Sequence, residues 1–142
     1  MTTRLVQVGP GPKPTFTAWG PDIREAAEAA YDHSADCRFT TFVGYEWTGA
    51  PGGNNLHRNV IFRNATVPEL PASNYEASTP EALWEALRVG CLEAGSGCDA
   101  LTIPHNSNLS GGLMFLLVDS AGAPITADFA RRRAGMEPLV QV

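Results

Sequence analysis

The stretch GYEWTGAPGGNNLHRN, residues 44–59, decides how the middle of this chain folds. It joins two segments, residues 38–47 and 56–63, that are rich in β-branched and aromatic residues and alternate in polarity, which is typical of β-strands. Too few residues separate Glu46 from His57 for a crossover helix, so we expect an antiparallel pairing or a wide loop between the strands. The glycines within residues 49–53 suit that connection.

On either side of this stretch, short helical segments alternate with further strands. Residues 21–33 and 126–135 have the apolar spacing of short amphipathic helices. Residues 98–105, CDALTIPH, have the pattern of a strand that Pro104 brings to an end. The last six residues, EPLVQV, have the pattern of the start of another strand. The sequence therefore predicts an α/β fold.

The clearest helix start lies at residues 78–80, Ser-Thr-Pro. Either Ser78 or Thr79 can cap this helix, and Pro80 suits its first turn. We expect the helix to continue to about Gly95. Its apolar stripe is expected to pack in the core rather than against a cofactor, and consists of Leu83, Trp84, Leu87 and Cys91.

Length and composition indicate one folded, loop-rich domain. The chain has 142 residues, with 14 glycines and 11 prolines that point to many turns. Its formal net charge is -5 and Lys13 is its one lysine, so no basic patch is available for nucleic acid. No apolar run approaches the ~20 residues of a membrane helix, and the first residues lack the apolar centre of an export signal. We therefore expect neither a nucleic-acid nor a membrane partner.

The first residues have the composition of a linker. Residues 9–14, GPGPKP, cannot sustain a helix or a strand. We expect residues 1–15 to be poorly structured and residues 16–142 to form the domain.

The sequence allows two interpretations of Cys91 and Cys98. They are close enough along the chain to form a disulfide, yet Cys91 also fits the apolar helix stripe as a buried thiol. A disulfide would favour an oxidising compartment. The compartment is otherwise open, and a periplasmic one for a longer parent protein is among the alternatives.

Glu46, His57 and His105 form a candidate metal site, because each stands at or near the end of a predicted strand. Two neutral imidazoles and one carboxylate can hold a divalent cation and leave positions for water. The alternatives are ordinary ones: a strand glutamate often pairs with a cation, and a lone histidine is often a hydrogen-bonded core residue.

Five segments resemble consecutive signatures of the DUF3604 family, a branch related to the PHP (polymerase and histidinol phosphatase) metallohydrolases. They are FTTFVGYEWT, NNLHRNVIFR, TPEALWEALR, IPHNSNLSGGLMF and EPLVQV. PHP proteins are distorted α/β barrels that hold two or three metal ions, usually zinc, manganese or iron, and hydrolyse phosphate esters. The resemblance implies a partial PHP-like distorted (β/α) barrel in which Glu46 bridges metals and His57 and His105 each ligate one.

This chain also departs from the family pattern. Family members have a His-x-His pair near the first strand and further histidine or aspartate ligands in a later segment, and neither is found here. The chain therefore resembles an internal piece of a longer protein, with part of the metal site missing. Sheet edges and apolar faces that a longer chain would cover are then expected to favour self-association.

For a small phosphorylated substrate, Arg58, Asn106 and Asn108 are candidate phosphate contacts, since guanidinium and amide groups donate hydrogen bonds to phosphate oxygens. The alternatives are a salt bridge for Arg58, which lies on the strand face opposite His57, and a purely structural turn after Pro104. Two functions thus stay open: a metal-dependent hydrolase of the phosphoesterase class, or a non-catalytic fragment or binding module without a complete metal cluster.

Overall fold

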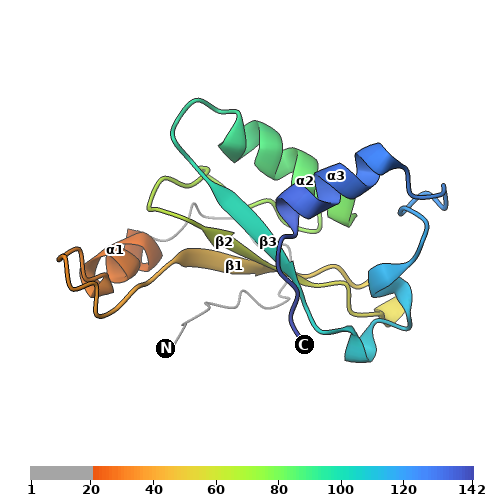
Figure 1. Cartoon of the computed structure of the whole chain (residues 1–142), viewed down its shortest axis with the longest axis horizontal. Helices are drawn as coiled ribbons and strands as arrows, with labels where there is room; N and C mark the ends of the chain where they lie inside the picture. Colours follow the sequence, from red (N-terminus) through yellow and green to blue (C-terminus); the bar gives the residue numbers. More distant parts are fainter. Residues whose placement is uncertain (1–20) are drawn as a thin grey trace.

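The computed structural model describes residues 21–142, which form an open three-stranded sheet with three helices (Figure 1). The predicted N-terminal segment, residues 1–15, lies outside the described residues. Strands β1 (Val43–Trp47), β2 (Arg58–Phe62) and β3 (Ala100–Pro104) lie in the order β1-β2-β3, and both pairings are antiparallel. The fold is thus mixed α/β, and the antiparallel alternative for residues 44–59 is confirmed.

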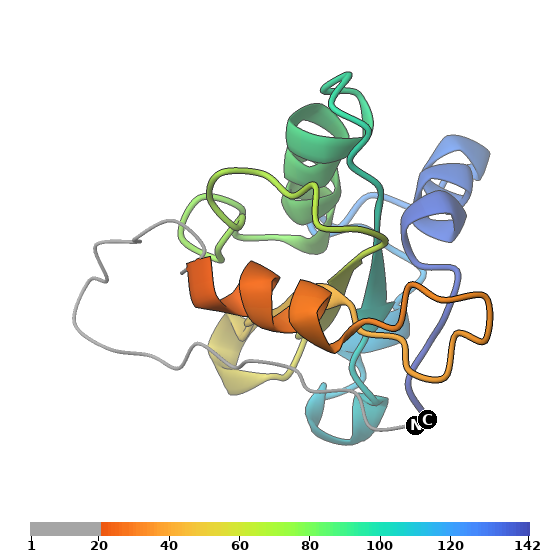
Figure 2. The ribbon, with the colours of Figure 1, turned by 90° about the vertical axis from the view of Figure 1, so that its left-hand side faces the viewer.

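The helices are α1 (Pro21–Ala30), α2 (Pro80–Leu87) and α3 (Ala127–Met136). Helices α2 and α3 lie over one face of the sheet, whereas α1 lies beside β1 (Figure 2). Thr79 is the cap of α2, because its hydroxyl accepts a hydrogen bond from the Ala82 backbone N–H at 3.2 Å. No helix in the described part of the chain is both long and apolar enough to cross a membrane.

The core lies between the sheet and the two helices above it, and the sheet face turned toward them is here called the helix face. Alternate residues of every strand are buried there, and Val60 and Phe62 are 0% exposed. The predicted apolar stripe, which runs along α2 and into the helical turn after it, faces them and is buried, as expected: Leu83, Trp84, Leu87 and Cys91. Full burial of one such apolar side chain stabilises the fold by roughly 1.5–3 kcal/mol.

The opposite side of the sheet, here called the histidine face, is less buried. Five of its strand residues are of intermediate burial, and Gly44, which is paired with Ile61, is buried. The five are Glu46, Asn59, Ile61, Leu101 and Ile103. This alternation along β2 and β3 is that of a sheet packed on one side.

Cys91 and Cys98 form a disulfide, with 4.9 Å between their Cα atoms. Cys91 lies in a π-helical turn, Arg88–Leu92, that continues α2, and Cys98 precedes β3. The bond therefore ties the end of this helical segment to the start of β3. Of the two interpretations of these cysteines, the structure has the disulfide.

Several segments differ from the sequence-based expectation. Strand β1 begins at Val43 rather than at residue 38, and α1 ends at Ala30 rather than at residue 33. The helical segment that starts at Pro80 ends at Leu92 rather than Gly95. Residues 137–142 form no strand, although the Gln141 backbone N–H donates a hydrogen bond to the Pro104 carbonyl at 3.1 Å. A single such bond brings this segment to the end of β3 without extending the sheet.

Candidate functional site

The strand register brings the two histidines of the candidate site together. Arg58 is paired with Pro104 at the end of β2 and β3, and the next residues, His57 and His105, continue the pairing. The His105 backbone N–H donates to the His57 carbonyl at 3.0 Å. Residues opposite each other in an antiparallel pair project to the same face. Accordingly, the two imidazole centroids lie 6.2 Å apart, with a 74° angle between the ring planes.

Glu46 lies on the same face and contacts His57. The distance from Glu46 Oε1 to His57 Nδ1 is 3.3 Å, and the two side chains are only 14% and 22% exposed. An ionised carboxylate can only accept a hydrogen bond, so His57 Nδ1 carries the hydrogen and donates it. The remaining ring nitrogen, Nε2, is then the atom with a lone pair, which is how carboxylates orient metal-binding histidines.

Asn55, which sequence reasoning did not single out, connects the two histidine loops. Its Oδ1 accepts a hydrogen bond from the His57 backbone N–H at 2.9 Å, and its Nδ2 lies 3.3 Å from His105 Nδ1. Its own backbone N–H donates to the Leu109 carbonyl at 2.8 Å. The asparagine pair in NNLH was the available signal, since short amide side chains often bond to nearby backbone groups.

Asn54 and Gly111 form a second close contact between the loop before β2 and the loop after β3. A Cβ atom at Gly111 would lie 2.3 Å from Asn54 Oδ1, and Gly111 has a φ of +59°. Both the close approach and the left-handed backbone favour glycine at this position. The loop before β2 and the loop after β3 are therefore packed against each other, next to the two histidines.

Asn106 and Asn108, two of the predicted phosphate contacts, follow His105 but differ in environment. Asn106 Oδ1 is buried and has no hydrogen-bond partner within residues 21–142. Asn108 lies exposed in a 3-10 turn, Ser107–Leu109. The structure thus keeps both residues near the histidine loop, and their role toward a substrate stays a prediction.

Arg58, the third predicted phosphate contact, lies on the helix face, away from His57. Its side chain is 3% exposed, and its Nε donates to Glu137 Oε1 at 3.0 Å. Burial lowers the pKa of Arg58 from its usual value, while the Glu137 carboxylate opposes that change. The structure therefore has the salt bridge that was the alternative for Arg58, and it does not bring Arg58 to the histidines.

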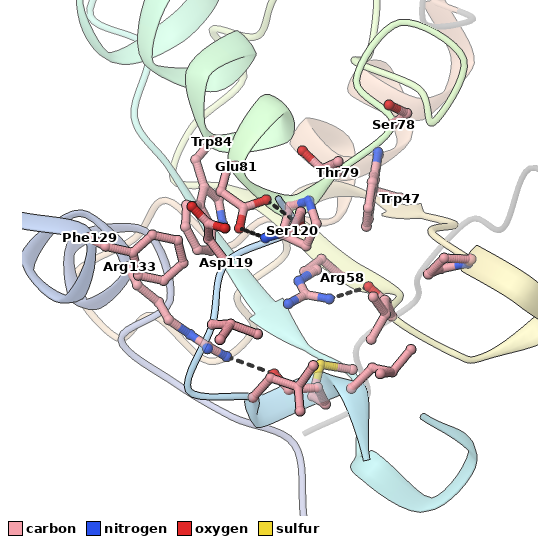
Figure 3. A pocket seen from close by; sticks show the side chains of 17 residues that line it. Trp47, Arg58, Ser78, Thr79, Glu81, Trp84, Asp119, Ser120, Phe129 and Arg133 are labelled. Atoms are coloured by element: carbon pink, nitrogen blue, oxygen red, sulfur yellow. Dashed lines mark hydrogen bonds between the residues drawn. The ribbon is translucent and has the colours of Figure 1, made fainter. Parts of the chain in front are cut away.

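Glu137 is the centre of a buried ion-pair cluster. Besides Arg58, its Oε2 accepts from Arg133 Nε at 3.0 Å and its Oε1 accepts from Trp84 Nε1 at 3.2 Å. A cavity of about 280 Å³ opens beside Arg58 and Arg133, and its apolar wall includes Trp47, Trp84 and Phe129 (Figure 3). Trp47 is a core residue, because it is 1% exposed and its Nε1 donates a hydrogen bond to the Ala77 carbonyl.

On the histidine face, His57 and His105 are the residues that could ligate a divalent cation. Two imidazoles, one of them oriented by a carboxylate, are typical of zinc, manganese or iron sites. Within residues 21–142, however, no group of three or more His, Cys, Asp or Glu side chains is arranged to hold a metal ion. The residues present therefore fit two nitrogen ligands and an orienting carboxylate, and they fall short of a complete ligand set.

The comparisons with known proteins identify a family. A model described as "Protein of unknown function (DUF3604)" matches residues 8–142, nearly the whole chain. A search of curated proteins and a search of solved structures found no match. Because the family model covers every strand and helix in the described part of the chain and both histidine loops, the chain belongs to the DUF3604 family.

Proposed function

We propose that this chain supplies the central part of the metal site of a metal-dependent hydrolase of the phosphoesterase class. The observation that carries the proposal is the pairing of His57 with His105, with Glu46 bonded to His57. These three residues come from three strands or strand ends, and His105 lies far from the other two along the sequence. Imidazoles brought together in this way, with one tautomer fixed by a carboxylate, have the arrangement of metal ligands.

We further propose that the chain is an internal piece of a PHP-like distorted (β/α) barrel. The open edges of a three-stranded sheet support this, because a closed barrel would need further strands on both sides. Both strand pairings, β1–β2 and β2–β3, are antiparallel and therefore depart from a regular β/α repeat, in which neighbouring strands are parallel. On this proposal all three strands belong to the distorted part of the barrel, and the missing ligands would come from the rest of the parent protein.

Each residue has a distinct task in this proposal. His57 and His105 present their Nε2 atoms to the cation, and Glu46 holds the His57 ring in the tautomer that ligation requires. When bound, a zinc, manganese or iron ion supplies Lewis acidity toward a phosphoryl oxygen. Asn106 and Asn108, beside His105, are the proposed donors to a small phosphorylated substrate, whereas Arg58 is held by Glu137 on the other face.

The test is a calorimetric titration of the metal-free chain with Zn²⁺ and with Mn²⁺. His57→Ala and His105→Ala should abolish measurable binding, because each removes a ligand, and Glu46→Ala should weaken it by about 10- to 100-fold. His33→Ala is the matched control, since His33 is exposed and pairs with Glu28 rather than with this site. Equal affinity in the wild type and in all three site variants would refute the proposal.

A second function is favoured by one specific observation, the lack of a complete three-residue ligand group in the described chain. On this account the chain is a non-catalytic fragment or a binding module. Hydrolysis of an aryl phosphate by the metal-loaded chain separates the two functions. Turnover that the His105→Ala variant loses supports the hydrolase, and metal binding without turnover supports the binding module.

A further inference from the structure

The cavity of about 280 Å³ on the helix face is formed by elements that are far apart along the chain. Its lining comes from β1, β2, α2, α3 and residues 113–120 (Figure 3). Three aromatic side chains, Trp47, Trp84 and Phe129, are here called the aromatic wall, and the last two meet edge to face with centroids 5.6 Å apart. Pockets for drug-sized molecules have volumes of roughly 300–1,000 Å³, so this cavity suits a smaller molecule with an apolar body.

Both guanidinium groups of the cavity have N–H groups left over from their bonds to the described chain. Arg58 donates from Nε to Glu137 and from Nη1 to the Leu56 carbonyl, and its Nη2 has no hydrogen-bond partner within residues 21–142. Arg133 donates from Nε and Nη2, and its Nη1 has no partner in that range. Two positive charges share the single negative charge of Glu137, which leaves a net charge of +1. The unused N–H groups and this charge suit a carboxylate.

Two carboxylates line the part of the cavity formed by α2 and residues 113–120. Glu81 accepts hydrogen bonds from the backbone N–H of Ser120 at 3.2 Å and from its hydroxyl at 2.6 Å, and Asp119 accepts from the backbone N–H groups two and four residues later. These donors are neutral, and in the described part of the chain neither carboxylate forms an ion pair. Burial lowers the pKa of Arg58, and Glu81 lies close enough for its charge to oppose this change. The carboxylates suit an ammonium group at a short distance from the guanidinium groups.

We infer that this cavity binds a small zwitterion, an α-amino acid with an apolar side chain. The carboxylate of the ligand accepts hydrogen bonds from the unused N–H groups of Arg58 and Arg133. Its ammonium group donates to Glu81 and Asp119, and its side chain packs against the aromatic wall. A ligand with a single charge would gain from one of these pairs and be repelled by the other.

The ligand leaves the ion-pair cluster of Glu137 intact. It uses only those N–H groups that Glu137 does not occupy, so the bonds of Glu137 to Arg58, Arg133 and Trp84 stay in place. The cavity also lies on the face of the sheet opposite the histidines. Binding of an amino acid is therefore independent of the proposed metal site.

The experiment is a titration of the full chain followed by tryptophan fluorescence, since two tryptophans belong to the aromatic wall. Phenylalanine is the zwitterionic probe, phenylpropanoate lacks its ammonium group, and phenethylamine lacks its carboxylate. We expect phenylalanine to bind with a Kd below about 1 mM and each analogue to bind at least about tenfold more weakly, because a hydrogen bond to a charged group contributes this much or more. The indole N–H signals of Trp47 and Trp84 in NMR spectra should shift with phenylalanine, which places the probe in this cavity.

Glu81→Gln removes one negative charge and keeps the size of the side chain. It should weaken phenylalanine about tenfold and should not weaken phenylpropanoate. Glu85→Gln is the matched control, because Glu85 lies on the same helix but pairs with Arg88 at the surface, and it should bind phenylalanine as the wild type does. Circular dichroism of both variants checks that they are folded.

Three results would overturn the inference: no binding of phenylalanine, equal affinities of the wild type for phenylalanine and phenylpropanoate, or equal affinities of folded Glu81→Gln and Glu85→Gln for phenylalanine. If Glu81→Gln does not fold, the comparison of the three probes with the wild type still decides. Loss of metal binding at the histidines would leave all of these results unchanged.

Discussion

Polar side chains are bonded differently on the two faces of the sheet. Arg58 and His57 are neighbours in the chain, but the side chain of Arg58 lies on the helix face and that of His57 lies on the histidine face. On the helix face, both Glu137 oxygens are occupied by Arg58, Arg133 and Trp84. On the histidine face, Glu46 and Asn55 engage the Nδ1 atoms, and no hydrogen bond within residues 21–142 uses Nε2 of His57 or His105.

Under the proposed function, this difference separates a structural role for the helix face from a binding role for the histidine face. A buried ion-pair cluster whose members satisfy each other has little capacity left for a ligand, and its removal mainly affects folding. A half-buried group that is oriented by neighbours but has an unused ring nitrogen can bind something else without unfolding the chain. The helix face should therefore respond to mutation through stability, and the histidine face through binding.

The largest effect is expected for Glu137→Ala. It leaves the buried guanidinium of Arg58 without a counter-ion and removes the acceptors of Arg133 and Trp84. Breaking a buried pair by removing one partner costs roughly 3–5 kcal/mol. Urea denaturation monitored by tryptophan fluorescence measures the free energy of unfolding.

Asp128→Ala is the matched control for Glu137→Ala, because Asp128 belongs to the same helix as Arg133 but pairs with Arg131 on the exposed side. Exposed ion pairs contribute little to stability. Its unfolding free energy should stay close to that of the wild type. If Glu137→Ala were no more destabilising than Asp128→Ala, the helix-face cluster would not be the structural element described here.

Truncation of two adjacent residues of β2, Phe62 and Ile61, compares the packing of the helix face with that of the histidine face. Phe62 is 0% exposed on the helix face, and Phe62→Ala should cost about 3 kcal/mol or more because it leaves a cavity in the core. Ile61 lies half-buried on the histidine face, so Ile61→Ala should cost clearly less, about 1 kcal/mol. Thermal or chemical unfolding of the two variants gives the ratio, and equal costs would show that the faces are packed alike.

Much of the fold could be predicted from local sequence signals. The alternation in residues 38–47 and 56–63 predicts two strands, with an antiparallel pairing as one of two alternatives. Ser78 or Thr79, followed by Pro80, predicts the start of α2. These signals are local, because strand faces and helix caps depend on residues two to four positions apart. The absence of a strand at EPLVQV was not predictable in this way, because pairing requires a partner edge that the sequence pattern does not specify.

For the candidate site, the sequence could predict that Glu46, His57 and His105 stand at strand ends, and the strand register then places them together. It could not predict the roles of Glu137 and Asn55. Glu137 meets Arg58 across most of the described chain, and such a contact leaves no periodic trace in the sequence. The amide of Asn55 contacts both histidine loops, and these contacts depend on how the two loops pack.

The smallest effect concerns Tyr45, a buried helix-face residue whose hydroxyl donates to the Ala72 carbonyl at 3.0 Å. Tyr45→Phe should lower the free energy of unfolding by about 1 kcal/mol near pH 7, the usual net contribution of one hydrogen bond. Tyr75→Phe is the control, since Tyr75 is 72% exposed, and it should have no measurable effect.

The same residue predicts a dependence on pH with a definite sign. Burial raises the pKa of the Tyr45 phenol well above its ordinary value of about 10. The folded chain then holds this proton more tightly than the unfolded chain, so the contribution is complete below about pH 10 and is lost as the pH rises through the raised pKa. At pH 11 the loss is about 1.4 kcal/mol, which offsets the hydrogen bond. The wild type and Tyr45→Phe should therefore have nearly equal unfolding free energies near pH 11, and a difference that stays constant from pH 7 to pH 11 would show that the phenol is not buried in its neutral form.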